Sequence, residues 1–189
     1  MSEHRPLDVD CDLTVVAVWP HAGAAADLVR ELKYGRATTV VTELAAAMAA
    51  VAPSADVVTW VPASPARRRR RGFDQGELLA RAVARRLGLR TRRALRRIDD
   101  EPQTSRGRDG RLLGPDFAGG GRRLRFTPTV LLIDDVVTTG STLRSAAKVL
   151  RARGAGRVCG LVATRAARDR SAKPLSGVYD LVTARPTGG

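Results

Sequence analysis

Apolar residues recur every three or four positions in four stretches of the chain, and this spacing predicts four amphipathic helices. The apolar positions are Ala25, Leu28, Val29 and Leu32 in the first; Val41, Leu44, Met48 and Val51 in the second; Leu79, Val83 and Leu87 in the third; and Leu143, Ala147 and Leu150 in the fourth. Met48 lies on an apolar stripe, so we interpret it as a core residue rather than a ligand.

Glycine and proline mark where these helices stop. The first ends near Gly35, the second before Pro53, the third at Gly88 and the fourth at Gly154. Asp74 is a suitable N-cap for the third helix, and Glu77 three residues later completes an acidic form of the capping box.

Apolar runs of strand length lie between the helices. They are residues 56–61 (DVVTWV), the run that begins TVLLI at Thr129, residues 158–164 and, more weakly, residues 178–182. Strands that alternate with helices indicate an α/β domain with a mainly parallel sheet flanked by helices. Ligands of such sheets bind beyond the carboxyl ends of the strands, at the switch point.

In two segments the apolar residues show neither helical nor strand spacing. We expect residues 1–20 to be a poorly defined N-terminal segment, and residues 98–123, rich in glycine and charge, to form a long mobile loop. Long loops in compact domains are often functional, so this one is a candidate lid over a ligand. By length, residues 1–189 make a single domain.

Charge adds a preference for anions. The chain has 33 Lys and Arg residues against 19 Asp and Glu, a net charge of +14, which predicts attraction to nucleic acid, phosphorylated small molecules or anionic membranes. Part of this excess is a compositional bias, since the chain is also rich in alanine and glycine. Clustered arginines are therefore more informative than the total.

Several classes of protein are disfavoured. Cys11 and Cys159 lie far apart, and neither belongs to a CxxC pair, so they predict neither a zinc site nor a disulfide framework. The start MSEHRPLDVDCD lacks the form of a signal peptide, and no apolar run approaches the roughly 20 residues that span a bilayer. We expect a cytoplasmic protein with no membrane span.

The candidate chemistry follows the strand that begins at Thr129. Two adjacent acids, Asp134 and Asp135, come at the tip of this strand, and a loop of small residues joins it to the next helix. That loop contains Thr138, Thr139, Gly140, Ser141 and Thr142. Unpaired N–H groups at the start of a helix, a flexible glycine and four hydroxyls suit a phosphate monoester. The alternative is that Ser141 or Thr142 merely caps the helix.

The two acids suit a different part of the same ligand. Adjacent carboxylates repel phosphate but accept charge-assisted hydrogen bonds from the vicinal hydroxyls of a sugar. A lysine-bearing P-loop is excluded, because no lysine follows a glycine in this chain. Two acids beside a phosphate-binding loop therefore predict a ribose 5-phosphate ligand.

The stretch VLLIDDVVTTGST, residues 130–142, is similar to the signature with which type I phosphoribosyltransferases bind phosphoribosyl pyrophosphate. A response-regulator receiver domain also has paired acids after a strand, but near its start and without the TTGST loop. Three further stretches resemble the ComF family of phosphoribosyltransferase-like proteins: LVRELKYG from Leu28, VPASPARRRRRGFDQGELLARAVARRLG from Val61, and PQTSRGRDGR from Pro102.

The chain departs from the ComF pattern in three places. Asp74 stands where the family usually has Asn, and Gly114 stands near the place of another usual Asn in a shortened segment. The common N-terminal zinc-binding segment is absent, so we expect no metal finger. The change near Gly114 bears on catalysis more than on the fold.

The resemblance implies roles for individual residues. Asp134 and Asp135 would hold the ribose hydroxyls, and residues 138–142 would hold the 5-phosphate. The turn at Ala63 and Ser64, with Arg70 and Arg71, would approach the pyrophosphate. Transfer in this family passes through a ribose cation, with pyrophosphate leaving alongside Mg²⁺. Substrate oxygens and water hold most of such a metal's coordination sphere, so few protein ligands are needed.

An unbroken run of arginines, residues 67–71, leaves a second function open. Eight more arginines lie between Arg81 and Arg97. This basic stretch is either a solvated face, a means of neutralising pyrophosphate, or a track for a nucleic-acid backbone. The ComF resemblance implies single-stranded DNA binding in natural transformation, for which Arg67, Arg68 and Arg69 are the candidates. The alternatives are thus an enzyme, a DNA-binding protein, or a sensor that binds phosphoribosyl pyrophosphate without turnover.

Overall fold

The computed structural model describes residues 7–8, 13–34, 38–98 and 116–166. Its centre is a six-stranded sheet in the order β1-β2-β8-β7-β3-β4. The strands are β1 (Leu7–Asp8), β2 (Leu13–Pro20), β8 (Arg157–Arg165), β7 (Thr129–Val137), β3 (Val57–Trp60) and β4 (Arg90–Thr91). All neighbours pair in parallel except β1, which is antiparallel to β2. The predicted mainly parallel sheet is confirmed.

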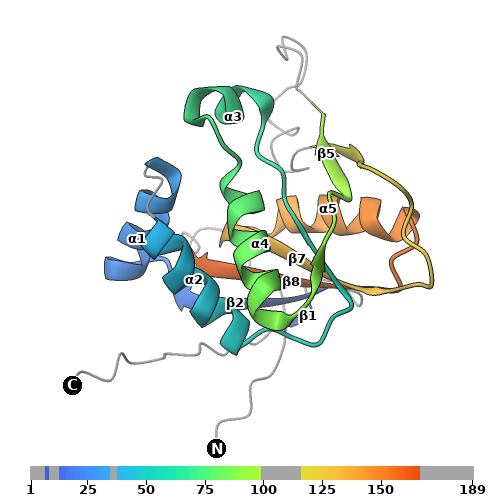
Figure 1. Ribbon diagram of the computed structural model, residues 1–189, viewed down its shortest axis with the longest axis horizontal. Coiled ribbons are helices and arrows are strands. Elements are labelled where there is room, and N and C mark those ends of the chain that lie inside the picture. The colour runs from blue at the N-terminus through green and yellow to red at the C-terminus, as the bar shows by residue number, and fades with distance from the viewer. Residues whose placement is uncertain (1–6, 9–12, 35–37, 99–115, 167–189) are drawn as a thin grey trace, which may run out of the picture.

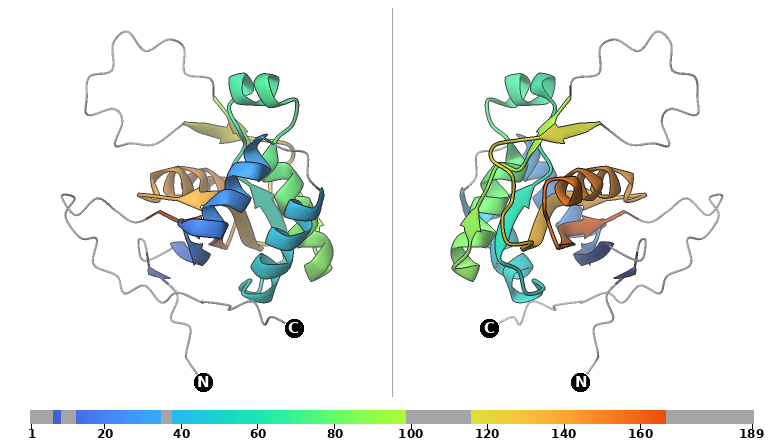
Figure 2. Two further views of the ribbon diagram at one scale, coloured as in Figure 1. Left: turned by 90° about the vertical axis from the view of Figure 1, so that its left-hand side faces the viewer. Right: turned by 90° about the vertical axis from the view of Figure 1, so that its right-hand side faces the viewer.

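Helices cover both faces of this sheet (Figures 1 and 2). One face carries α1 (Gly23–Tyr34), α2 (Thr38–Ala50) and α4 (Gln75–Leu87), and the other carries α5 (Ser141–Ala152). These are the four helices that the apolar spacing predicts. None of the described helices is long and apolar enough to cross a bilayer.

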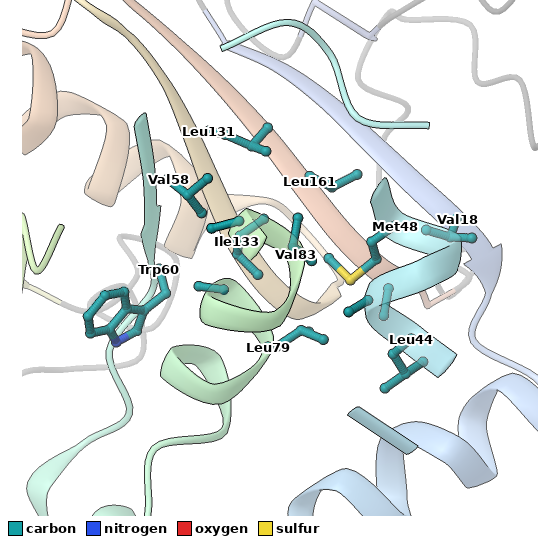
Figure 3. Close-up of a cluster of buried hydrophobic side chains, with 14 of the residues drawn as sticks. Val18, Leu44, Met48, Val58, Trp60, Leu79, Val83, Leu131, Ile133 and Leu161 are labelled. Carbon is teal, nitrogen blue, oxygen red and sulfur yellow. The ribbon is translucent and has the colours of Figure 1, made fainter. Parts of the chain in front are cut away.

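Alternation along the central strands supplies a core on each face. Leu131 and Ile133 of β7 pack with α1, α2 and α4, whereas Val130 and Leu132 pack with α5. Met48 is fully buried in the first of these cores, which confirms its interpretation as a core residue (Figure 3).

The expectation that residues 1–20 are poorly defined is wrong for their second half. Residues 13–20 form β2, whose register runs from Leu13 opposite Val158 to Pro20 opposite Arg165. Leu13 and Val15 are buried in the core beneath α5. The run LTVVAVWP has the β-branched character of a strand, and β8 provides the hydrogen-bonding partner along its whole length.

The loop expected over residues 98–123 is shorter at its C-terminal end. Residues 117–119 form β6 (Phe117–Gly119), which pairs antiparallel with β5 (Leu95–Arg97). Phe117 is buried beside Leu95, so one aromatic side chain ties this part of the segment to the core. Residues 99–115, and the weak strand expected at 178–182, lie outside the described residues.

The order of the strands places a switch point between β3 and β7. The connection through α4 leads from β3 outward to β4, while the connection through α5 leads from β7 to β8 in the opposite direction. These two connections run over opposite faces, and ligands of open α/β sheets bind where such connections diverge, here at the carboxyl ends of β3 and β7. The residues after β3 and those at the end of β7 therefore share one edge of the sheet.

Candidate functional site

Both acids lie within β7 rather than at its tip. The strand continues to Val137, because β8 runs beside it and Asp134 and Val136 stay in register with Val162 and Thr164. On its other side β7 extends beyond the end of β3, because the last residue pair of these two strands is Trp60 and Ile133. The Asp134 carboxylate caps this open side, since its Oδ1 accepts the backbone N–H of Asp135 at 2.9 Å.

The two acids have different environments. Asp135 is buried on the face that carries α1, where its Oδ2 lies 3.2 Å from Nζ of Lys33. Asp134 precedes it along the strand and is less buried, and its carboxyl group interacts with the carboxylate of Asp135 and with the ammonium of Lys33. The two carboxyl groups thus lie close together at the switch point of the sheet.

The surroundings raise the pKa of Asp134 well above its usual range. Withdrawal from water is the main cause, and the neighbouring Asp135 carboxylate adds to it. The backbone N–H of Asp135 and the ammonium of Lys33 act in the opposite direction but do not cancel the rise. A cationic or hydroxyl-bearing ligand would relieve the repulsion between the two carboxylates.

The small-residue loop leads directly from β7 into α5. Gly140 occupies the N-cap position with φ 74°, a left-handed conformation that glycine adopts without strain. Because Gly140 has no side chain, the helix start lacks the side-chain cap that one alternative proposed. The hydroxyls of Thr139 and Ser141 lie 3.0 Å apart, and Arg144 Nη2 donates to the Thr139 carbonyl at 2.9 Å. The Thr139 hydroxyl also accepts the backbone N–H of Ser141 at 3.4 Å, so contacts within the loop hold the start of α5.

The turn after β3 comes to the same edge. The N–H of Val61 donates to the carbonyl of Ile133 at 2.9 Å, which holds the turn beside β7. Two of its polar groups already have partners in the chain: Ala63 N–H donates to Asp74, and the Ser64 hydroxyl accepts the N–H of Arg67. The family resemblance implies that Ala63 and Ser64 approach the pyrophosphate, and it does not indicate these internal contacts.

The arginine run forms a helix that the apolar pattern did not predict. This helix, α3 (Pro65–Arg71), starts with Ser64 as N-cap and ends at Gly72, whose φ is 75°. It has no buried residue, and it stands at the carboxyl edge of the sheet (Figures 1 and 2). Proline at the first position and glycine after the last are a recognised helix signature, so the signal was present in the sequence.

Arg67, Arg68, Arg69 and Arg70 are exposed on α3, and Arg71 is half-buried. The structure thus brings the arginines, the turn, the acid pair and the small-residue loop to one edge of the sheet. Among the described residues, no group of three or more His, Cys, Asp or Glu side chains could hold a metal ion.

Comparison with known proteins shows which family the chain matches. Residues 74–184 match the family model described as phosphoribosyl transferase domain. The chain is 33% identical over 98 residues to the competence protein ComFC of Bacillus subtilis (strain 168), and this match covers 52% of the chain but only 39% of that protein.

Two solved structures also resemble the chain. Glutamine phosphoribosylpyrophosphate amidotransferase from B. subtilis shows 21% identity and a TM-score of 0.48, covering 70% of this chain and 30% of that one. Adenine phosphoribosyltransferase from Leishmania tarentolae shows 14% identity and a TM-score of 0.42, covering 80% of this chain and 91% of that one.

Proposed function

Because the chain belongs to the phosphoribosyl transferase domain family, as its motifs predicted, we propose that it binds phosphoribosyl pyrophosphate and transfers the ribose 5-phosphate to a nitrogenous acceptor. One observation carries this proposal: Asp134 and Asp135 lie at the switch point of the sheet, immediately before the N-terminus of α5. A diol site and a phosphate site are thus adjacent.

Residues 138–142 form the site for the 5-phosphate. Gly140 at the N-cap offers no side chain to the first turn of α5, and the helix dipole is positive there. A bound phosphate would compete with the Thr139 hydroxyl, which accepts the N–H of Ser141 at 3.4 Å. Gly140 lets the phosphate approach the backbone, because no side chain lies in between. The hydroxyls of Thr138, Thr139, Ser141 and Thr142 supply further donors.

Asp134 and Asp135 accept hydrogen bonds from the 2′- and 3′-hydroxyls of the ribose. Their negative charge also favours the ribose cation that develops as the bond from C1 to pyrophosphate breaks. The acceptor nitrogen then forms its bond to C1 and loses a proton, while pyrophosphate leaves. The burial of Asp135 and the partial burial of Asp134 strengthen these charge interactions relative to water.

Pyrophosphate would lie over the turn after β3. Ser64 is at this turn, and Arg70 and Arg71 follow it at the end of α3. Mg²⁺, when bound, neutralises charge on the departing pyrophosphate. Phosphate oxygens and water would hold most of the coordination sphere of this ion.

Calorimetric titration with phosphoribosyl pyrophosphate and Mg²⁺ tests the proposal, with Asp134→Asn/Asp135→Asn as the variant. Each charged hydrogen bond contributes about 1.5–3 kcal/mol, so the double variant should bind at least about tenfold more weakly. Asp27→Asn/Glu43→Gln removes the same charge from two exposed positions and should bind normally.

Unchanged affinity in a folded Asp134→Asn/Asp135→Asn variant would contradict the assignment. Pyrophosphate release, assayed against a panel of nitrogenous acceptors, then separates an enzyme from a sensor. Binding without release against any acceptor would favour the sensor.

A second candidate function is non-specific binding of single-stranded DNA in natural transformation. The observation that favours it is α3, which buries no residue and exposes Arg67, Arg68 and Arg69 in one turn. Such a cluster attracts a phosphate backbone without reading its sequence. The relative from B. subtilis is named a competence protein, which agrees with this candidate.

A further inference from the structure

We propose that Lys33 is a positioning residue for the acid pair, and that its ammonium group holds the Asp135 carboxylate in place for ligand binding. This inference rests on the proposed function. Lys33 belongs to the stretch LVRELKYG, in which Val29 and Leu32 are explained by burial in the core but Lys33 is not.

The geometry of the ion pair supports a specific role. Nζ of Lys33 lies 3.2 Å from Oδ2 of Asp135, and the two side chains are 28% and 11% exposed. Oδ2 is buried and accepts no hydrogen bond from the described residues, so the ion pair is its main compensation. Removing one partner of a buried pair leaves an uncompensated charge, which is far more costly than losing a surface pair.

The position of Lys33 is itself fixed by packing. It is in the last turn of α1, directly after Leu32, which is 1% exposed in the core. A cation at the C-terminal end of a helix is also favoured by the helix dipole. The ammonium therefore reaches the end of β7 from a rigid element.

The charged groups around the acid pair come from several elements. Asp135 acts on Asp134 from the same strand, and Lys33 acts on both from α1. From the neighbouring edge, the Thr164 hydroxyl lies 3.5 Å from the Asp135 carbonyl and 2.8 Å from Nδ1 of His21. Lys33 is thus the cation that the structure places against the pair.

Loss of Lys33 should strengthen proton binding by Asp134, because the ammonium group lowers the pKa of that carboxyl group. With no ammonium nearby, the two carboxylates repel each other more strongly and one of them retains a proton to a higher pH. A protonated pair accepts fewer hydrogen bonds from a diol. Binding of phosphoribosyl pyrophosphate should then weaken at neutral pH and recover as the pH rises.

The test compares Lys33→Met, Lys33→Arg and the control Lys148→Met, which removes an exposed lysine of α5. Calorimetry with phosphoribosyl pyrophosphate and Mg²⁺ is run from pH 6 to pH 9. We expect Lys33→Met to lose at least about tenfold in affinity near pH 7, with a smaller loss at pH 9. Lys33→Arg should restore binding to within about threefold, because it keeps the charge.

A loss that is equal at every pH, or that Lys33→Arg does not restore, would show a merely structural role and overturn the inference. A second measurement needs no ligand. Carbon-13 NMR of the carboxyl groups should show Asp134 titrating at a higher pH in Lys33→Met than in wild type. An unchanged titration would overturn the inference, whereas absent ligand binding by wild type would overturn only the proposed function.

Discussion

The carboxylate of Asp74 accepts the backbone N–H of Ala63 at 3.1 Å and thereby ties the turn after β3 to the start of α4. The same side chain caps α4, accepting the N–H groups of Gly76 at 3.0 Å and Glu77 at 3.3 Å. Asp74 is buried, so these three N–H groups satisfy a carboxylate that would otherwise be costly. One residue thus links a helix cap to an edge of the site.

Asp74→Ala should lower the free energy of unfolding by about 2–4 kcal/mol, because it removes a helix cap and leaves the Ala63 N–H without an acceptor. Asp74→Asn keeps one oxygen for the N–H groups of α4 but turns its amide NH2 group toward the Ala63 N–H. Its free energy of unfolding should therefore fall by less than that of Asp74→Ala. Urea denaturation measures both.

Ser64→Ala is the matched control for this cap. It removes the cap of α3, a helix that buries nothing, and should cost about 1 kcal/mol or less. Equal losses for Asp74→Ala and Ser64→Ala would contradict a linking role for Asp74.

Asp134→Asn should increase stability at neutral pH. The pKa of Asp134 is raised in the folded protein, so the folded state binds its proton more tightly than the unfolded chain does. The free energy of unfolding therefore falls as pH rises through the range between the two pKa values, by about 1.4 kcal/mol per pKa unit. Asparagine has no such proton and still offers an oxygen to the Asp135 N–H.

Denaturation at pH 4 and pH 7.5 checks this sign. At pH 7.5 the free energy of unfolding of the variant should exceed that of wild type by more than about 1 kcal/mol. At pH 4 the difference should be smaller. Asp27→Asn, at an exposed position, should show no such trend. A variant less stable than wild type at pH 7.5 would contradict the raised pKa.

Gly140→Ala should weaken ligand binding more than its effect on folding explains. Gly140 has φ 74° at the start of α5, so alanine there costs about 1–2 kcal/mol of strain and adds a methyl group at the phosphate site. Gly88→Ala is a close control, because its φ is 68° and a methyl group there would meet open space.

Both glycine variants should lose similar stability in thermal or urea denaturation. Only Gly140→Ala should reduce affinity for phosphoribosyl pyrophosphate, by about tenfold or more. If both variants bind as wild type does, residues 138–142 do not form the 5-phosphate site.

Arg67→Gln/Arg68→Gln/Arg69→Gln should flatten the salt dependence of single-stranded DNA binding. Each phosphate contact contributes about −0.7 to the slope of log affinity against log salt, so the slope measures contacts directly. Binding of phosphoribosyl pyrophosphate should stay nearly intact, because the 5-phosphate loop follows a different strand. We leave Arg70 and Arg71 unchanged, since both are candidates for the pyrophosphate.

The control for this experiment removes equal charge elsewhere in the chain. Arg122→Gln/Arg125→Gln/Arg157→Gln alters three exposed arginines outside residues 67–97, one of which begins β8. It should leave the salt slope almost unchanged. The reverse pattern, with lost phosphoribosyl pyrophosphate affinity and an unaltered slope in the α3 variant, would assign these arginines to the small ligand alone.

Local patterns predicted most of the long elements but missed the eight-residue strand β2. The helices α1, α2, α4 and α5 and the strands β3, β7 and β8 follow from spacing, caps and breakers in the sequence. The shorter strands could not be predicted from these local patterns. Strands β4, β5 and β6 have two or three residues each, too few to show alternation, and they form because a neighbouring segment supplies hydrogen bonds and burial.

The sequence by itself determined the kind of site: two acids on a buried strand, followed by small residues that start a helix. It did so because each feature lies within a few adjacent residues. Only the tertiary structure decided how the two acids differ. Lys33 reaches Asp135 because α1 packs on one face of the sheet, while the surrounding chain withdraws Asp134 from water. Contacts between distant segments depend on which faces meet, and local pattern does not encode that.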